Sequence, residues 1–539
     1  MKFQKKVVLA VALLAFFVSP ALAAQVQFLS TNDMHSRLYS QENGETKQTA
    51  GGFAKLRTAV DEAKKSYKGD TLVVSGGDYT EGFFYYYFKG KPEAIASNMV
   101  GYDITTVGNH EFDAGGEEFI NFLNLIKYPM ISSNLTFKDP ELNKRVKRPL
   151  IMKTKSGVKV GFFGLTTTEL AATSHICETG FVTVEQDTVK VAQAAVDELK
   201  KQGCDMIVAL THLGYETDLL LARRVRGINA IIGGHTHTKV EALTVEKDPD
   251  GNDVIITQTG CYAENLGKLD LCVEKGKTVL AKSHWLLDPI DGRYKENAEI
   301  AKYLEPFMAE LEKKLGVTIS VCLDPINLGK AWTRSNESPI GSMIADAMRE
   351  GAKTDVAIQH AGGVRGGMTL DPGPVSALTM NTILPFGNSV CIVEMTGEEL
   401  KQIMEVSASA YVYEGDGFDG QLRTPGGGFM QISGMRVTYD MSKKPALVDN
   451  NNNVKFPGER VVKLEVLKDG AFAPVDPKAT YKLATTDWTA SAADKYYPFA
   501  GKKVLNTATT NKEFFIQKLT KIGEKFNLPK QDRMIFIKR

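Results

Sequence analysis

Five short, mostly apolar segments of this chain are each followed within a few residues by side chains that can bind metal ions. They lie at residues 26–29, 71–74, 104–107, 205–210 and 230–232, and they are rich in β-branched residues. Such segments are typical of short buried strands. Between them, residues 189–201 and 217–225 have the apolar spacing of helices. This alternation predicts a layered α/β domain, in which ligands bind at the carboxyl ends of the strands.

The side chains at these predicted strand ends form a mixed set of nitrogen and oxygen ligands. They are Asp33, His35, Asp78, Asn109, His212, His235 and His237. Seven such residues are too many for one catalytic zinc ion, which usually takes three protein ligands, but they fit two ions that share a carboxylate. The histidine content and the absence of cysteine from this ligand set favour Zn, Mn, Fe or Co over a purely oxygen-binding Mg or Ca site. We therefore expect two divalent metal ions as cofactors.

The segment that follows residues 104–107 adds a histidine that the metal set does not need. Gly108 permits a tight turn, and His110 can donate a proton or stabilise a developing negative charge. Asp113, three residues later, can hold the imidazole in one tautomer. This arrangement suits attack of a metal-bound water on a phosphate ester. The alternative is a polar turn whose side chains satisfy one another.

The N-terminus has the pattern of a secretory signal peptide. Three lysines precede the apolar residues 7–18, and Ala21-Leu22-Ala23 supplies a cleavage site after Ala23. No later stretch is long and apolar enough to be a membrane span. The sequence therefore predicts a soluble exported protein, periplasmic if the cell has two membranes.

Charge and length restrict the function classes further. Removing residues 1–23 takes away three of the 65 basic residues and none of the 64 acidic ones, so the formal net charge changes from +1 to −2. A net charge near zero gives no electrostatic indication that the protein binds nucleic acid or a membrane surface. The 539 residues favour two domains.

Six cysteines are few for this length, so disulfides are not expected to form the framework of the fold. Whether Cys261 and Cys272 form a disulfide or remain buried thiols is left open.

Five motifs of the chain resemble the five blocks of the metallophosphoesterase (calcineurin-like) superfamily: Asp33-x-His35, Gly77-Asp78, Gly108-Asn109-His110-Glu111, His212 and Gly234-His235-x-His237. Their residues are similar to those of the 5′-nucleotidase branch. The resemblance implies an N-terminal four-layer αββα sandwich followed by a C-terminal α/β nucleotidase domain. It assigns Asp33, His35, Asp78 and His237 to one metal ion, and Asp78, Asn109, His212 and His235 to the other. By the same resemblance, His110 and Asp113 form the catalytic dyad.

The second half of the chain continues this resemblance. Gly362-Gly363-x-Arg365 is similar to a block whose arginine contacts substrate phosphate, and Phe429 and Trp488 fall where two aromatic rings would stack on a nucleobase. Asp494 would meet the ribose, although Ala492-Ala493-Asp494-Lys495 replaces the family's Gly-Gly-Asp-Gly. Two weaker pocket candidates are more easily explained as a turn residue and a solvated loop charge, respectively: Asn388 and Arg423.

These observations predict a signal peptide at 1–23, a metallophosphoesterase domain at 24–337, an inter-domain helix at 338–352 and a substrate-binding domain at 353–539. The expected function is metal-dependent release of phosphate from nucleoside 5′-monophosphates. Alternatives are a UDP-sugar or NAD pyrophosphatase, a 2′,3′-cyclic-nucleotide phosphodiesterase, or a periplasmic nucleotide-binding protein without catalysis. The expected partner is a small nucleotide, not a nucleic acid polymer, and the sequence leaves the oligomeric state open.

Overall fold

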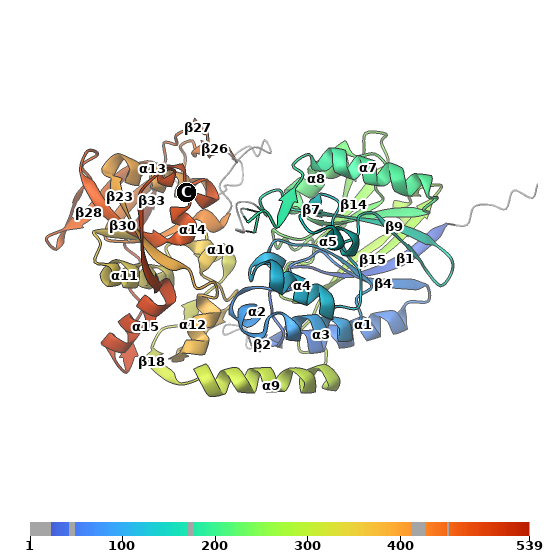
Figure 1. Cartoon of the computed structure of the whole chain (residues 1–539), viewed down its shortest axis with the longest axis horizontal. Coiled ribbons are helices and arrows are strands. Elements are labelled where there is room, and N and C mark those ends of the chain that lie inside the picture. The colour runs from blue at the N-terminus through green and yellow to red at the C-terminus, as the bar shows by residue number, and fades with distance from the viewer. Residues whose placement is uncertain are drawn as a thin grey trace, which may run out of the picture.

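The computed structural model describes residues 23–42, 49–170, 176–177, 179–410, 426–449 and 452–537. The predicted signal peptide up to residue 22 and the pocket candidate Arg423 lie outside the described residues. The chain forms two α/β domains that lie side by side (Figure 1). Helix α9 (Ala298–Leu315) packs against the first domain and reaches α12 (Ala377–Ile383) of the second. Within the described ranges, no helix has both the length and the hydropathy that a bilayer crossing needs.

The first domain contains two mixed sheets. One has the strand order β16-β15-β1-β4-β5-β6, and the other has the order β13-β14-β12-β11-β9-β8. The parallel strands that lead to the predicted ligand residues are β1 (Ala24–Thr31), β4 (Asp70–Ser75) and β5 (Ile104–Thr106) in one sheet, and β11 (Met206–His212) and β12 (Ala230–Ile232) in the other. Strand β9 (Lys159–Thr166) is parallel to β11, but no predicted ligand follows it. The remaining strands of these two orders are β6 (Met130–Ile131), β8 (Leu150–Lys153), β13 (Thr244–Lys247), β14 (Asp253–Thr257), β15 (Asn265–Glu274) and β16 (Lys277–Thr278). Strand β11 is buried along its whole length, because both of its faces are covered, and this explains its nearly continuous apolar sequence.

The two sheets pack face to face through large apolar side chains. Phe28 of β1 meets Phe162 of β9 edge to face, with ring centroids 6.1 Å apart, within one buried cluster drawn from both sheets. Helices cover the outer faces: α1 (Phe53–Ser66), α3 (Lys91–Val100) and α4 (Gly116–Leu125) on one side, and α7 (Thr188–Lys201) and α8 (Tyr215–Arg224) on the other. The predicted four-layer αββα sandwich is confirmed.

The second domain is built on a sheet with the order β24-β20-β30-β23-β31. Strand β20 (Val356–His360) divides two cores, because Val356 and Ile358 pack in the cluster of α13 (Gly397–Ser409) and Ala357 packs in the cluster of α11 (Pro339–Ala352). The neighbouring strands are β23 (Ser389–Thr396), β24 (Met430–Ser433), β30 (Thr480–Thr486) and β31 (Val504–Thr510). The segment 338–352, for which the sequence predicts a helix between the domains, forms α11, and α11 packs against β20, β24 and α15 (Asn511–Ile522).

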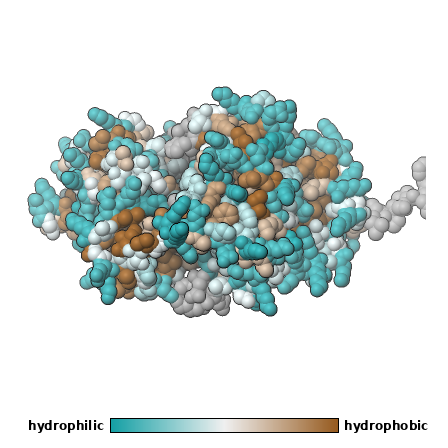
Figure 2. All heavy atoms as spheres, turned by 60° about the horizontal axis from the view of Figure 1, so that its bottom comes forward, coloured by the Kyte–Doolittle hydropathy of each residue, from teal (hydrophilic) through white to brown (hydrophobic). Residues whose placement is uncertain are grey.

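The surface in Figure 2 is mostly hydrophilic, with hydrophobic residues in scattered areas. Isolated exposed side chains such as Val317 and Leu505 are normal for a folded protein. The cysteines Cys261 and Cys272, which the sequence left open as a pair, are both unbonded. Cys261 borders the large cavity described below, whereas Cys272 is buried in β15.

Candidate metal centre and substrate cavity

The ligand loops meet because the parallel strands of both sheets end at the same edge of the sandwich. The loop after β1 is tied to the loop after β4 by Asp33 N–H, which donates to Gly77 O at 2.9 Å. The loop after β12 approaches the same place so closely that a Cβ on Gly76 would lie 2.5 Å from Gly233 O. Only glycine permits this backbone contact between the two sheets.

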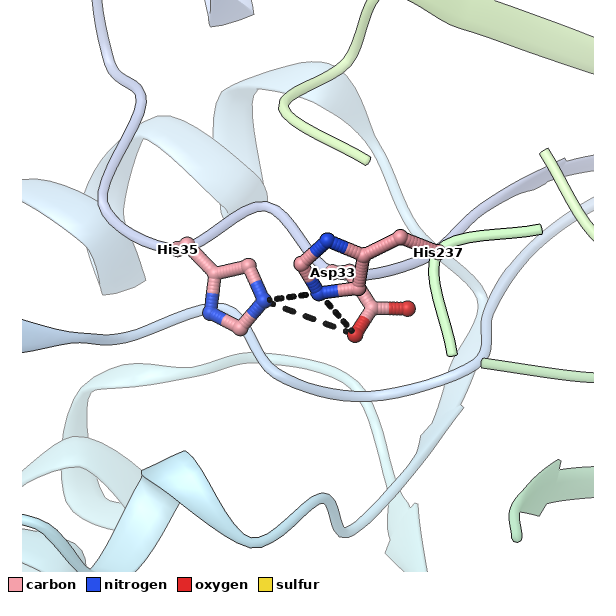
Figure 3. A group of neighbouring side chains, drawn as sticks. All are labelled: Asp33, His35 and His237. Carbon is pink, nitrogen blue, oxygen red and sulfur yellow. Dashed lines mark hydrogen bonds and ion pairs between the residues drawn. The ribbon is translucent and has the colours of Figure 1, made fainter. Parts of the chain in front are cut away.

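The first group of ligand atoms is formed by Asp33, His35 and His237, which Figure 3 shows converging on one point. His35 Nε2 and His237 Nε2 are 2.8 Å apart. Asp33 Oδ1 lies 3.4 Å from His35 Nε2 and 3.1 Å from His237 Nε2. His35 is drawn from the loop after β1 and His237 from the loop after β12, so both sheets contribute to this group.

The second group lies beside the first and uses the other predicted ligands. Asp78 Oδ2 is 2.9 Å from His212 Nε2, and His235 Nδ1 is 3.0 Å from Asn109 Oδ1. Asp78 Oδ2 is also 3.9 Å from His35 Nε2, which places this carboxylate between the two groups. The structure therefore brings together all seven residues that the sequence singled out.

This donor set fits divalent cations. Three combinations of histidine and carboxylate side chains have ligand atoms within 4.8 Å of one another, and two of them share Asp33. The two imidazole nitrogens and the carboxylate oxygen lie about 3 Å apart, close enough to bind one cation together. Mixed nitrogen and oxygen ligands suit Zn, Mn, Fe or Co.

Most of these seven residues have a backbone conformation that residues other than glycine rarely adopt. Their φ angles are positive: 53° at Asp33, 48° at His35, 58° at Asp78, 82° at His235 and 58° at His237. A left-handed conformation costs roughly 1–2 kcal/mol for a residue with a Cβ atom, and it concentrates at functional sites. The surrounding loops therefore hold strain at the centre.

Glu111 is a structural residue of the centre that the sequence analysis did not single out. Its buried carboxylate accepts hydrogen bonds from the backbone N–H groups of Tyr79, Gly108 and Asp78, at 2.6, 2.7 and 3.2 Å. It thereby ties the loop after β4 to the loop after β5. Its position next to His110 in the motif was the available signal.

His110 stands at the edge of the centre and is backed by a carboxylate. His110 Nδ1 is 2.7 Å from Asp113 Oδ2, as the spacing of three residues predicted. Burial opposes protonation of the ring, but the negative charges of Asp113, Asp78 and Glu81 outweigh burial and raise the pKa of His110 to about 10. The ring can therefore donate a hydrogen bond or a proton at neutral pH.

A cavity of about 1200 Å³ lies between the two domains and opens onto these side chains. Its wall includes most of the predicted site residues: Asp78, Asn109, His110, Asp113, His235, His237, Arg365, Asn388, Trp488 and Asp494. Asp33, His35 and His212 are buried and do not line it. Four of the seven predicted ligands, Asp78, Asn109, His235 and His237, thus form part of the floor of the cavity, and the second domain supplies its opposite wall.

Phe429 is not where the sequence analysis expected it. Its side chain is fully buried in the core of the second domain, in the cluster that contains Leu400 and Met404, and it does not line the cavity. A ring enclosed by apolar side chains cannot stack on a base, so this assignment does not agree with the structure. An aromatic residue beside glycines gives the same sequence pattern whether it faces a cavity or a core.

The remaining pocket candidates also make contacts within the protein. Trp488 Nε1 donates to Asp494 Oδ2 at 3.3 Å, and Asn388 Nδ2 donates to Asp487 Oδ1 at 3.1 Å. Ala492, Asp494 and Lys495 all have positive φ angles, of 64°, 54° and 65°. The segment therefore keeps the left-handed turns for which glycines are better suited.

The second domain also brings cationic side chains to the cavity that the sequence analysis did not assign. Arg334 and Lys330 line the wall near Arg365. Burial, reinforced by the neighbouring charge of Arg365, lowers the pKa of Arg334 to about 10, and burial together with Arg334 lowers the pKa of Lys330 to about 7. Burial and the same two arginines lower the pKa of His360 to about 3, so this ring is neutral. The wall opposite the predicted metal ligands is therefore suited to an anion.

Comparisons with known proteins agree with this arrangement. Residues 26–239 match the family model described as calcineurin-like phosphoesterase, and residues 318–501 match that of the 5′-nucleotidase C-terminal domain. The chain is 28% identical to the 5′-nucleotidase of Diplobatis ommata, over 90% of this chain and 85% of that protein. It is also 28% identical to the trifunctional nucleotide phosphoesterase YfkN of Bacillus subtilis, over 92% of this chain, but it spans only 34% of that longer protein.

A solved structure extends the likeness to the whole fold. The crystal structure of a 5′-nucleotidase precursor from Thermus thermophilus matches with a TM-score of 0.82 at 26% identity, covering 96% of this chain and 100% of the other. Both domains and their order are thus shared. The chain belongs to the 5′-nucleotidase family of calcineurin-like metallophosphoesterases, which are metal-dependent hydrolases of phosphoric esters.

Proposed function

We propose that this protein is an exported hydrolase that releases phosphate from nucleoside 5′-monophosphates with the help of two divalent cations. One observation carries the proposal: two adjoining groups of metal ligands and the His110–Asp113 pair face a wall with two arginines across one cavity. A phosphoryl group needs both features, because it carries negative charge and presents oxygens for bidentate contacts. Export is proposed from the signal peptide pattern alone.

The proposed ligands form two sets that share one carboxylate. One cation would be held by Asp33, His35, Asp78 and His237, and the other by Asp78, Asn109, His212 and His235. When bound, such cations lower the pKa of a coordinated water and neutralise part of the phosphoryl charge. The protein contributes by fixing these side chains at the floor of the cavity.

The other residues of the cavity have separate proposed tasks. Asp113 fixes the ring of His110 through Nδ1, so that Nε2 is directed away from it and can donate to a phosphoryl oxygen. Arg365 and Arg334 would bind the phosphate from the opposite wall. Trp488 offers a stacking surface for a base, and Asp494 offers hydrogen-bond acceptors for the ribose.

A second candidate function follows from the size of the cavity. A typical small-molecule pocket has a volume of about 300–1000 Å³, and this cavity is larger, at about 1200 Å³. The extra space favours substrates with a large leaving group, such as UDP-sugars or NAD. Hydrolysis of their pyrophosphate bond would use the same side chains.

The test is phosphate release by the purified protein without residues 1–23. Release from AMP with added Mn²⁺ or Zn²⁺, abolished by a chelator, is the expected result. Replacing His110 with Ala is expected to lower kcat by about 10²–10⁴-fold while leaving the metal content unchanged. A wild-type rate in His110→Ala would refute the role of this ring, and silence on AMP with cleavage of UDP-glucose or NAD would favour the second candidate.

A further inference from the structure

Glu81 is a buried carboxylate that contacts a side chain of each domain. It lies three residues after Asp78 and precedes helix α2 (Gly82–Phe88), and only 7% of its side chain is exposed. Its backbone N–H donates to Ser36 Oγ at 3.0 Å, which fixes the start of the helix beside the loop after β1. The side chain is therefore held at a defined place next to the metal ligands.

The carboxylate of Glu81 is directed at Arg365 of the second domain. Glu81 Oε1 is 2.5 Å from Arg365 Nη2, and only 13% of the Arg365 side chain is exposed. The other oxygen, Oε2, is 3.3 Å from His35 Nδ1. Arg365 Nε is buried and has no hydrogen-bond partner among the described residues. Arg365 therefore has Nη2 in an ion pair with Glu81, while its Nε is without a hydrogen-bond partner among the described residues.

Two anions cannot use this guanidinium equally well at the same time. A buried guanidinium is stable only with an anionic partner, and Glu81 supplies one from within the protein. A phosphoryl group needs two parallel donors for a bidentate contact, and the contact with Glu81 occupies one of the nitrogens that would provide them. The negative charge of Glu81 would also repel a phosphate placed on Arg365, because both side chains are buried and water screens their charges poorly.

We propose that Glu81 is an internal competitor for the phosphate subsite: it occupies Arg365 when the cavity contains no phosphate, and it must give up this arginine when a phosphoryl group binds. The inference rests on the proposed function in that it takes a phosphoryl group as the ligand. It makes Glu81 a residue that sets how tightly substrate and product phosphate are held. A weaker hold on product phosphate would favour its release.

The test is the affinity of metal-free protein for inorganic phosphate, measured by isothermal titration calorimetry after chelator treatment. Glu81→Gln keeps the size of the side chain and an oxygen toward His35 but removes the charge. We expect it to bind phosphate about tenfold more tightly than the wild type. Glu117→Gln removes an exposed charge from the same domain and is the matched control, with an expected change of less than twofold.

Arg365→Met identifies the route of the effect. In that background the second substitution, Glu81→Gln, is expected to give no further gain in affinity. An unchanged or weaker affinity in Glu81→Gln, the same gain in Glu117→Gln, or the same gain without Arg365 would each overturn the proposal. If Glu81→Gln does not fold, Glu81→Asp replaces it, because the shorter side chain withdraws from Arg365; an affinity equal to that of the wild type would then overturn the proposal.

Failure of this inference and failure of the proposed function are distinguishable, because the titration needs neither metal nor catalysis. Normal hydrolysis of AMP with an unchanged phosphate affinity in Glu81→Gln would remove the role of Glu81 alone. A tenfold gain in affinity in a protein that does not hydrolyse AMP would remove the proposed substrate and leave the competition for Arg365 intact.

Discussion

At position 108, beside the metal centre, there is no space for a Cβ atom, so only glycine fits. A Cβ atom on Gly108 would lie 2.0 Å from Asp78 Oδ1, far inside van der Waals contact. Asp78 stands between the two ligand groups, so its displacement would disturb both. This position therefore constrains the centre as strongly as a ligand does.

We expect Gly108→Ala to lose bound metal. Substitutions of residues that orient a metal ligand typically lower metal affinity by about 10–100-fold, and this substitution would displace the proposed ligand Asp78 itself. Metal content after dialysis against a weak chelator, measured by mass spectrometry, is the readout. Gly292→Ala is the control, because a Cβ there meets nothing within 4 Å. Full metal content in Gly108→Ala would show that Asp78 is not a ligand in the proposed position.

The stability of the fold depends on pH through a second residue, Glu93. Glu93 of α3 is fully buried, and burial raises its pKa to about 7 from an ordinary value of 4.5, although Ser36 Oγ donates to it at 2.7 Å. The folded protein therefore keeps this proton at pH values where the unfolded chain has released it. Stability from this group is complete below about pH 4.5 and is lost as the pH rises through about 7.

Glu93→Gln is expected to remove this pH dependence. The free energy of unfolding of the wild type should fall between pH 4.5 and 7 by at most about 3 kcal/mol through this residue. The variant should show a flatter profile of urea midpoints over the same range, whereas Glu117→Gln should follow the wild type. Parallel profiles for wild type and Glu93→Gln would show that the carboxyl is ionised in the folded state.

At the scale of the element, helix α11 shows how local signals set the ends of a helix. Ser338 Oγ accepts a hydrogen bond from Gly341 N–H at the start, and Pro339 occupies the first turn. At the other end, Lys353 adopts a left-handed conformation with φ 54°, the position that usually holds glycine. Ile340, Ile344 and Met348 face the core between these ends.

Lys353→Gly is expected to stabilise the second domain by about 0.5–1 kcal/mol, because glycine adopts positive φ without a steric cost. The side chain is exposed, so no packing is lost. A higher urea midpoint than in the wild type is the measurement. Lys353→Ala keeps a Cβ and should show no gain; an equal gain in both variants would point to the loss of charge as the cause.

The sequence predicted best what depends on neighbours in the chain. Each predicted metal ligand follows a short apolar strand within a few residues, so the strand end and the candidate ligand were visible together, and the spacing of His110 and Asp113 gave their contact. The sequence could not predict contacts between segments that are far apart along the chain. Glu81 meets Arg365 only when two domains are docked, and the burial of Phe429 follows from packing against a helix that no local pattern specifies.

At the scale of the whole molecule, bound cations should stabilise the fold. The ligand atoms come from loops of both sheets, and a ligand that binds only the folded state stabilises it by mass action. At 100 times the dissociation constant, Zn²⁺ or Mn²⁺ is expected to add about 2.7 kcal/mol to the free energy of unfolding. The measurement is a thermal melt with metal and with chelator. Asp78→Asn should show a smaller difference, and equal melting temperatures in all samples would exclude a metal centre of this kind.

The separation of the ligands along the chain also fixes an order of events in the life of the protein. Asp33 and His235 are 202 residues apart in sequence, yet the backbone N–H of one donates to the carboxylate of the other. An unfolded chain offers cations only scattered, weak sites. The sandwich therefore has to close before the centre exists. With the proposed export, the protein would take its metal from the ions present where it folds, not from those present where it is translated.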